Sequence, residues 1–150
     1  MSEKIKGLMP WILTFFAAAM GIASFFLIFA PSVTYDAYIL GENSFKGLHT
    51  ALGYIRGDIT VLHASAGMII AYLFPLLGAA TAVIGKDNMI ARIAATALFL
   101  VGGALSFAAT ALVRPVFTAT ATLGLGSIFS GVTAMLGACS EGAYCILFRK

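Results

Sequence analysis

Four long apolar runs constrain this chain more than any other feature of its sequence. They occupy residues 9–30, 62–85, 89–113 and 121–148. Each run exceeds the roughly 20 residues that a helix needs to cross about 30 Å of hydrocarbon. The composition agrees, because 61% of the residues are hydrophobic and 10% are charged, whereas soluble domains carry about 25% charged residues. The sequence therefore predicts an all-α membrane protein, in which residues 1–150 form a single four-transmembrane-helix bundle.

Lysine and arginine fall unevenly on the two sides of such a bundle. Cytoplasmic loops carry the excess of these residues in membrane proteins. We therefore expect a multi-pass protein of the cell membrane, plasma or inner, with both termini in the cytoplasm. The nine basic residues are scattered along the chain, so no nucleic acid is expected as a partner. The inner side would hold Lys4, Lys6, Lys86, Arg92, Arg149 and Lys150, and the outer side would hold Lys46, Arg56 and Arg114.

Residues 31–61 form the one sizeable segment outside the predicted membrane. Residues 32–40 are rich in β-branched and aromatic side chains, which favour a strand. Residues 44–53 fit either a second strand or a short interfacial helix, since Phe45, Leu48 and Leu52 recur at helical spacing. We expect this segment of about 30 residues, a short β-hairpin or an interfacial helix, to lie over the bundle as a lid.

One long first outer connection followed by short ones resembles the plan of claudin-like tetraspan proteins. Residues 31–61 contain neither the tryptophan nor the paired cysteines of that family's first outer loop. The resemblance is one of architecture and implies no function.

Small residues recur along every predicted span at spacings of three or four. The fourth span, for example, contains Ser127, Gly131, Ala134, Ala138 and Gly142. Lipid tails are as apolar as leucine, so helices in a bilayer associate by close backbone approach at small residues and through a few polar contacts. These rows predict the helix–helix seams of a compact bundle, and the alternative is a smooth face for a partner subunit.

Glu141 is the one acidic residue inside an apolar run. A carboxyl group at membrane depth is costly and is a functional-site hypothesis by default. It follows Ala134 by seven residues and therefore lies on the small-residue face, toward protein. Arg92, at the inner start of the third run, has a comparable depth and is its natural partner. The pair would pin two helices together, take part in proton or ion binding, or contact another protein.

A second group of polar and aromatic residues lies outside the predicted membrane. These residues form a candidate outer contact surface for a partner or ligand, although a surface at headgroup depth explains them equally well. One histidine, His49, lies in the outer segment, and the other, His63, lies at the start of the second span. Neither belongs to a group of residues at the spacing typical of metal ligands, so we expect no metal. The residues of the candidate outer contact surface are Tyr35, Asp36, Tyr38, His49, Tyr54 and His63.

Three functions are compatible with so few polar residues. The first is a non-enzymatic interaction, accessory or scaffold subunit that uses its outer segment and small-residue faces to bind a membrane protein or a second copy. The alternative is a homo-oligomeric transporter or channel with Glu141 on the path of an ion or proton. The third is a membrane enzyme that acts on a lipid or quinone. No GxSxG, P-loop or HExxH motif is present, so no catalytic residue or cofactor is predicted and an enzyme is disfavoured.

Overall fold

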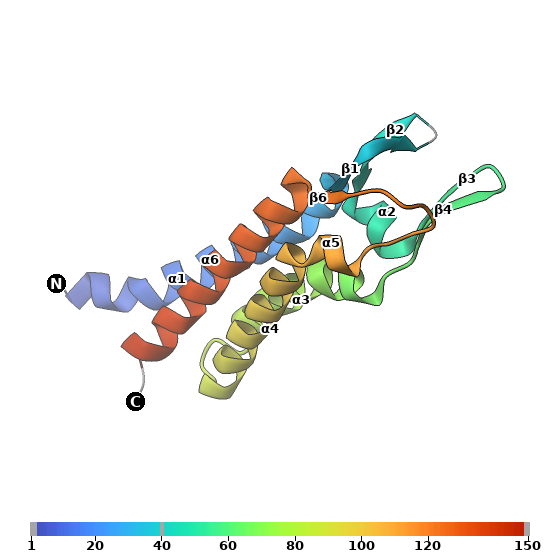
Figure 1. Cartoon of the computed structure of the whole chain (residues 1–150). Helices are drawn as coiled ribbons and strands as arrows, with labels where there is room; N and C mark the ends of the chain where they lie inside the picture. The colour runs from blue at the N-terminus through green and yellow to red at the C-terminus, as the bar shows by residue number, and fades with distance from the viewer. Residues whose placement is uncertain (1–2, 40, 149–150) are drawn as a thin grey trace.

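The long helices of the computed structural model pack side by side (Figure 1). The structure describes residues 3–39 and 41–148. The ring order is α1, α3, α4 and α6, and each of these helices contacts two neighbours. The start of α1, the α3–α4 turn and the end of α6 lie at one end of the bundle, and the strands lie at the other (Figure 1). The bounds are α1 Glu3–Phe26, α3 Ala66–Ile84, α4 Met89–Phe107 and α6 Leu125–Leu147.

Three helical segments among the described residues are long and apolar enough to cross a membrane. They are Gly7–Phe29, Ala66–Ile84 and Met89–Phe107. The first combines most of α1 with the short 3-10 helix η1 (Leu27–Phe29). Helix α6 has 23 residues, but its glycines, serines and Glu141 lower its mean hydropathy and it is outside this group. Membrane-spanning length and apolarity are thus confirmed for three helices, and a crossing by α6 stays a prediction.

The described residues are mostly helical, as the sequence predicts, and two small antiparallel sheets cap one end of the bundle. In the first, β1 (Pro31–Ile39) lies between β2 (Glu42–Lys46) and β6 (Ala121–Leu123). Val33 lies opposite Phe45 on one side and Leu123 on the other. The short helix α2 (Gly47–Leu52) follows β2, so residues 44–53 contain both a strand and a helix.

The second sheet contains the hairpin of β3 (Tyr54–Arg56) and β4 (Ile59–His63), with β5 (Arg114–Pro115) beside β4. Gly57 forms the hairpin turn with a φ of +62°, a conformation that glycine adopts without steric cost. Both sheets therefore join residues 31–63 to the link between α4 and α6. The outer segment packs over one end of the bundle, and Figure 1 shows the tips of the two strand pairs projecting beyond it.

Strands β4 and β6 also move two of the predicted span boundaries. The second span starts at Ala66 instead of residue 62, because β4 occupies the preceding residues and Ser65 caps the helix, accepting from the Met68 N–H at 3.4 Å. The third helix ends at Phe107, and the short helix α5 (Ala109–Leu112) follows it. The fourth helix starts at Leu125 instead of residue 121, because β6 pairs with β1.

Phe99 of α4 fills the centre of the bundle. Its ring is fully buried and lies against a glycine from each of the other three long helices: Gly21 of α1, Gly78 of α3 and Gly137 of α6. A Cβ atom built on Gly137 would lie 2.7 Å from the ring. The small-residue rows therefore form a socket for one large side chain as well as helix–helix seams.

Serine hydroxyls connect the helices above Phe99, toward the sheets. The Ser24 and Ser130 hydroxyls are 2.8 Å apart, and Ser106 lies 3.3 Å from Ser130. Ser32 at the start of β1 lies 2.6 Å from Ser127 of α6. All five side chains are buried, and such interhelical contacts contribute about 0.6 kcal/mol each in membrane proteins.

One apolar cluster joins the sheets to the outer end of the bundle. It includes Val33 of β1, Phe45 of β2, Leu62 of β4 and Tyr72 of α3. The strands and the helix tops therefore share a core, and the outer region is packed against the bundle instead of hanging from it on a linker.

Candidate functional site

Arg92 and Glu141 meet at the end of the bundle that is opposite to the sheets. Arg92 lies in the first turns of α4 and Glu141 in the last turns of α6. The Nη1 group of Arg92 donates to both carboxylate oxygens of Glu141, at 2.9 and 2.8 Å. The exposed fractions of the two side chains are 1% and 0%. The structure thus brings together the two residues that the sequence singled out as a pair.

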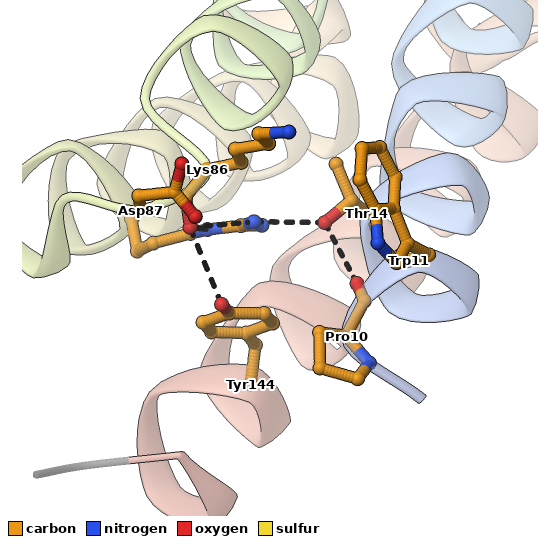
Figure 2. Close-up of a pocket in the computed structure, with 7 residues that line it drawn as sticks. Pro10, Trp11, Thr14, Lys86, Asp87 and Tyr144 are labelled. Atoms are coloured by element: carbon orange, nitrogen blue, oxygen red, sulfur yellow. Dashed lines mark hydrogen bonds between the residues drawn. The ribbon is translucent and has the colours of Figure 1, made fainter. Parts of the chain in front are cut away.

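The remaining guanidinium donors of Arg92 also bind protein atoms. Nε and Nη2 each donate to the main-chain carbonyl of Lys86 at 3.1 Å, and Nη2 donates to the Thr14 hydroxyl at 2.8 Å (Figure 2). A guanidinium has five N–H groups, and with the two contacts to Glu141 this makes five contacts. Arg92 is therefore saturated by α1, α6 and the α3–α4 turn.

Tyr144 closes the cluster on one face of the guanidinium. The Cζ atom of Arg92 lies 3.8 Å from the centre of the Tyr144 ring, a cation–π distance. The Tyr144 hydroxyl donates to the Lys86 carbonyl at 3.2 Å, and Thr14 donates to the carbonyl of Pro10 at 2.8 Å (Figure 2). This interaction network connects α1, α4 and α6 with the α3–α4 turn.

This geometry uses the pair to hold helices together. Removing one member of a buried ion pair costs about 3–5 kcal/mol because it leaves an uncompensated charge. The hydroxyls of Thr14 and Tyr144 already donate to main-chain carbonyls. The hydroxyl of Ser140 likewise donates to the carbonyl of Leu13 at 2.9 Å. In the described part of the chain, no three histidine, cysteine or acidic side chains are grouped as metal ligands would be.

A small pocket of about 60 Å³ opens beside this cluster. The ammonium of Lys86 lies 4.0 Å above the centre of the Trp11 ring. Figure 2 shows the Lys86 side chain extending toward Trp11, with Asp87 next to it. The pocket lining consists of Pro10, Trp11, Thr14, Lys86, Asp87, Arg92 and Tyr144.

The six outer candidates do not form one surface. Tyr35 is only 2% exposed and its ring lies 4.8 Å from that of Phe117, so its assignment to a contact surface is wrong. Burial raises the pKa of Tyr35 above its usual value near 10.0, since the anion would lose its hydration. Asp36 accepts from the Thr120 N–H at 2.9 Å and so holds the α5–α6 link.

The other four candidates are spread over both strand pairs. Tyr38 is exposed near the end of β1. The His49 and Tyr54 rings stack at 4.4 Å, half-buried between α2 and β3. His63 is exposed at the end of β4, opposite Arg114, instead of opening the second span.

A groove of about 270 Å³ lies next to His63 at the base of the β3–β4 hairpin. The hairpin itself exposes Ile55 and Ile59, by 66% and 57% respectively. Sequence reasoning missed this feature, although the Gly57 turn between two β-branched segments was a hairpin signal. The groove is lined by Leu52, Gly53, Ile55, Thr60, Leu62, His63 and Ala64.

Sequence reasoning also missed two members of the inner cluster. Thr14 could have been noticed as a polar residue in the first span. The Lys86 carbonyl carries no signal in the sequence, because any residue in that turn supplies a carbonyl.

No protein-family model, curated protein or solved structure matches the chain.

Proposed function

We propose that the chain is a four-span membrane protein that acts as an interaction or scaffold subunit. Its bundle holds the two sheets on the outer side of the membrane, both termini lie in the cytoplasm, and the β3–β4 hairpin contacts a partner protein. We propose a non-enzymatic role.

The distribution of residues around α6 supports a fourth crossing. The polar side chains Ser127, Ser130 and Glu141 are buried against the other helices. The large apolar side chains face outward, at positions that recur every three or four residues: Leu125, Phe129, Val132 and Leu136. A helix in water shows the opposite pattern, whereas an intramembrane charge faces the bundle interior. The outward face of α6 therefore suits lipid despite its moderate hydropathy.

The β3–β4 hairpin is the observation that carries the interaction proposal. Figure 1 shows it projecting past the end of the bundle, where a four-span placement would put it outside the hydrocarbon. Ile55 and Ile59 are exposed there, and Leu52 is exposed at the adjacent groove. Ile55 shares a face with Thr60 and Ile59 shares the other with Arg56, so the hairpin exposes an apolar side chain on each face. Exposed apolar side chains on an element that projects outside lipid suit contact with a partner protein.

The buried polar groups support a structural role for the bundle interior. All the Arg92 donors bind protein atoms, and the Phe99 ring occupies the centre of the bundle. These side chains stabilise the bundle, which leaves the outer region to make specific contacts.

Variants of the hairpin test this proposal. We expect the combined substitutions Ile55→Ser and Ile59→Ser to reduce cross-linking to partner proteins, or to a second copy, at least tenfold in intact membranes. Loss of two central apolar contacts commonly costs 2 kcal/mol or more, and 1.4 kcal/mol is tenfold. Tyr38→Ser is the matched control, since Tyr38 is equally exposed on the other strand pair. Equal cross-linking by the double variant and the control would refute the proposal.

A flux measurement separates this proposal from transport. Under the transport hypothesis, Glu141→Gln abolishes flux of the transported ion or proton in reconstituted vesicles. Under the scaffold proposal, wild-type and Glu141→Gln vesicles show the same background flux, and the variant differs only in stability. Wild-type flux above that of empty vesicles, lost on substitution, would contradict the scaffold.

A further inference from the structure

Two charged side chains at the pocket beside Trp11 are not used by the bundle interior. Arg92 and Glu141 neutralise each other, but the ammonium of Lys86 lies against the Trp11 ring, without an ion pair among the described residues. Asp87 is exposed at the rim of the same pocket (Figure 2). The pocket therefore presents one unmatched cation and one unmatched anion as neighbours.

An apolar ledge leads from this pocket along α1 toward the middle of the bundle. The ring of Trp11 stacks on that of Phe15, with 6.0 Å between centroids. Phe15 is 63% exposed, and Ile12 beside it is also exposed. Since α1 runs from the inner end outward, Phe15 lies one turn deeper in the proposed membrane than Trp11. Tryptophan and lysine at this depth are typical of the membrane–water interface.

We propose that this pocket and ledge bind one phospholipid whose headgroup carries a primary ammonium beside its phosphate, the ethanolamine class. The Lys86 ammonium would bind the phosphate, the Asp87 carboxylate would bind the lipid ammonium, and an acyl chain would lie along Trp11 and Phe15. The pocket volume of about 60 Å³ exceeds the roughly 10–15 Å³ that a single water needs. It therefore suits one small polar group at the end of a chain that lies outside it.

The same charges discriminate between headgroups. A choline headgroup has the same net charge but no N–H group to donate to Asp87. A glycerol headgroup has no cation to pair with the Asp87 carboxylate, and its net negative charge is repelled by that carboxylate. Asp87 thus selects ethanolamine, whereas Lys86 contributes to the binding of every phospholipid. This inference depends on the inner placement of the pocket in the proposed four-span arrangement.

Lipid retention by the purified full-length chain tests the inference. The delipidated protein is incubated with equimolar phosphatidylethanolamine, phosphatidylcholine and phosphatidylglycerol of identical acyl chains, and bound lipid is counted by native mass spectrometry. We expect the wild type to enrich phosphatidylethanolamine at least about threefold over each competitor, the scale of a partly exposed charge pair. Lys86→Gln should lower the retention of all three lipids, and Asp87→Asn should lower phosphatidylethanolamine and raise phosphatidylglycerol.

Matched controls make the result specific. Lys46→Gln and Asp58→Asn remove the same charges from exposed positions in the outer region and should retain the wild-type preference. Soluble phosphoethanolamine should compete far more weakly than the lipid, because it lacks the acyl chain. Equal retention of the three lipids by the wild type, unchanged retention in Lys86→Gln, unchanged preference in Asp87→Asn, or equal competition by phosphoethanolamine would overturn the inference.

The readouts keep this inference separate from the proposed scaffold function. The hairpin variant Ile55→Ser/Ile59→Ser should lose partner cross-linking and keep the lipid preference. Asp87→Asn should lose the lipid preference and keep the cross-linking. Folding of the pocket variants is secure, since Arg92 and Tyr144 bind the main-chain carbonyl of Lys86 and not its side chain.

Discussion

Replacing Glu141 with alanine perturbs the most heavily bonded side-chain cluster of the bundle. The substitution removes both acceptors of the Arg92 Nη1 group, at 2.9 and 2.8 Å. The guanidinium keeps its contacts to the Lys86 carbonyl and to Thr14. It remains buried, however, with a positive charge that nothing in the cluster then compensates.

The expected loss of stability follows from that burial. Breaking a buried ion pair on one side costs about 3–5 kcal/mol. For a chain of 150 residues, 1 kcal/mol corresponds to about 2–4 °C in melting temperature, so the loss is about 6–20 °C. Glu141→Gln keeps one acceptor oxygen and should lose less. The double variant Arg92→Met/Glu141→Leu should be more stable than either single variant, because an apolar pair leaves no uncompensated charge.

Thermal unfolding in mild detergent measures these differences. The control is Asp58→Ala, an exposed carboxylate of the outer hairpin, which should change stability by less than about 0.5 kcal/mol. A Glu141→Ala variant within about 1 kcal/mol of the wild type would refute the assignment of a buried, compensating pair. Additive losses in the double variant would do the same, since two contacting residues must show a coupling energy.

Other substitutions test the packing and the outer core. Phe99→Ala should cost about 3–5 kcal/mol, because the glycine socket cannot collapse around the cavity. Phe129→Ala on the exposed side of α6 should cost far less in the same thermal assay. Gly137→Ala should destabilise, since its Cβ would lie 2.7 Å from the Phe99 ring, whereas Gly142→Ala meets nothing within 4 Å and should be neutral or stabilising. Tyr35 should resist deprotonation above pH 10, because its pKa is raised by burial. Tyr35 therefore holds its proton more tightly in the folded state than in the unfolded state. The free energy of unfolding should fall as the pH rises through the raised pKa. Tyr35→Phe should remove this part of the alkaline loss in a pH series of melting temperatures.

The inner end of the bundle was predictable because burial of charge leaves few options. A lone glutamate on the small-residue face had to find a cation, and Arg92 was the basic residue at matching depth. Thr14 and the Lys86 carbonyl complete the site only because α1 and the α3–α4 turn meet there. That proximity is a tertiary property, and no local pattern encodes it.

In the outer region, the sequence predicted a strand but not the strands with which it pairs. The β-branched residues of 32–40 indicated a strand, but β1 also pairs with residues 121–123, which sequence reasoning assigned to a span. Apolar strands and apolar spans look alike over a few residues, so the helix starts at Ser65 and Gly124 were missed. Long-range strand pairing decided these boundaries.

The membrane crossing of α6 is the central claim, and cysteine accessibility tests it most directly. Cys139 and Cys145 are first replaced by alanine, and single cysteines are placed at Asp58, Asp87 and Phe148. Four crossings predict that a membrane-impermeant maleimide labels position 58 in intact cells and labels positions 87 and 148 only after permeabilisation. Labelling of position 148 together with position 58 in intact cells would mean that α6 does not cross, and would contradict the account.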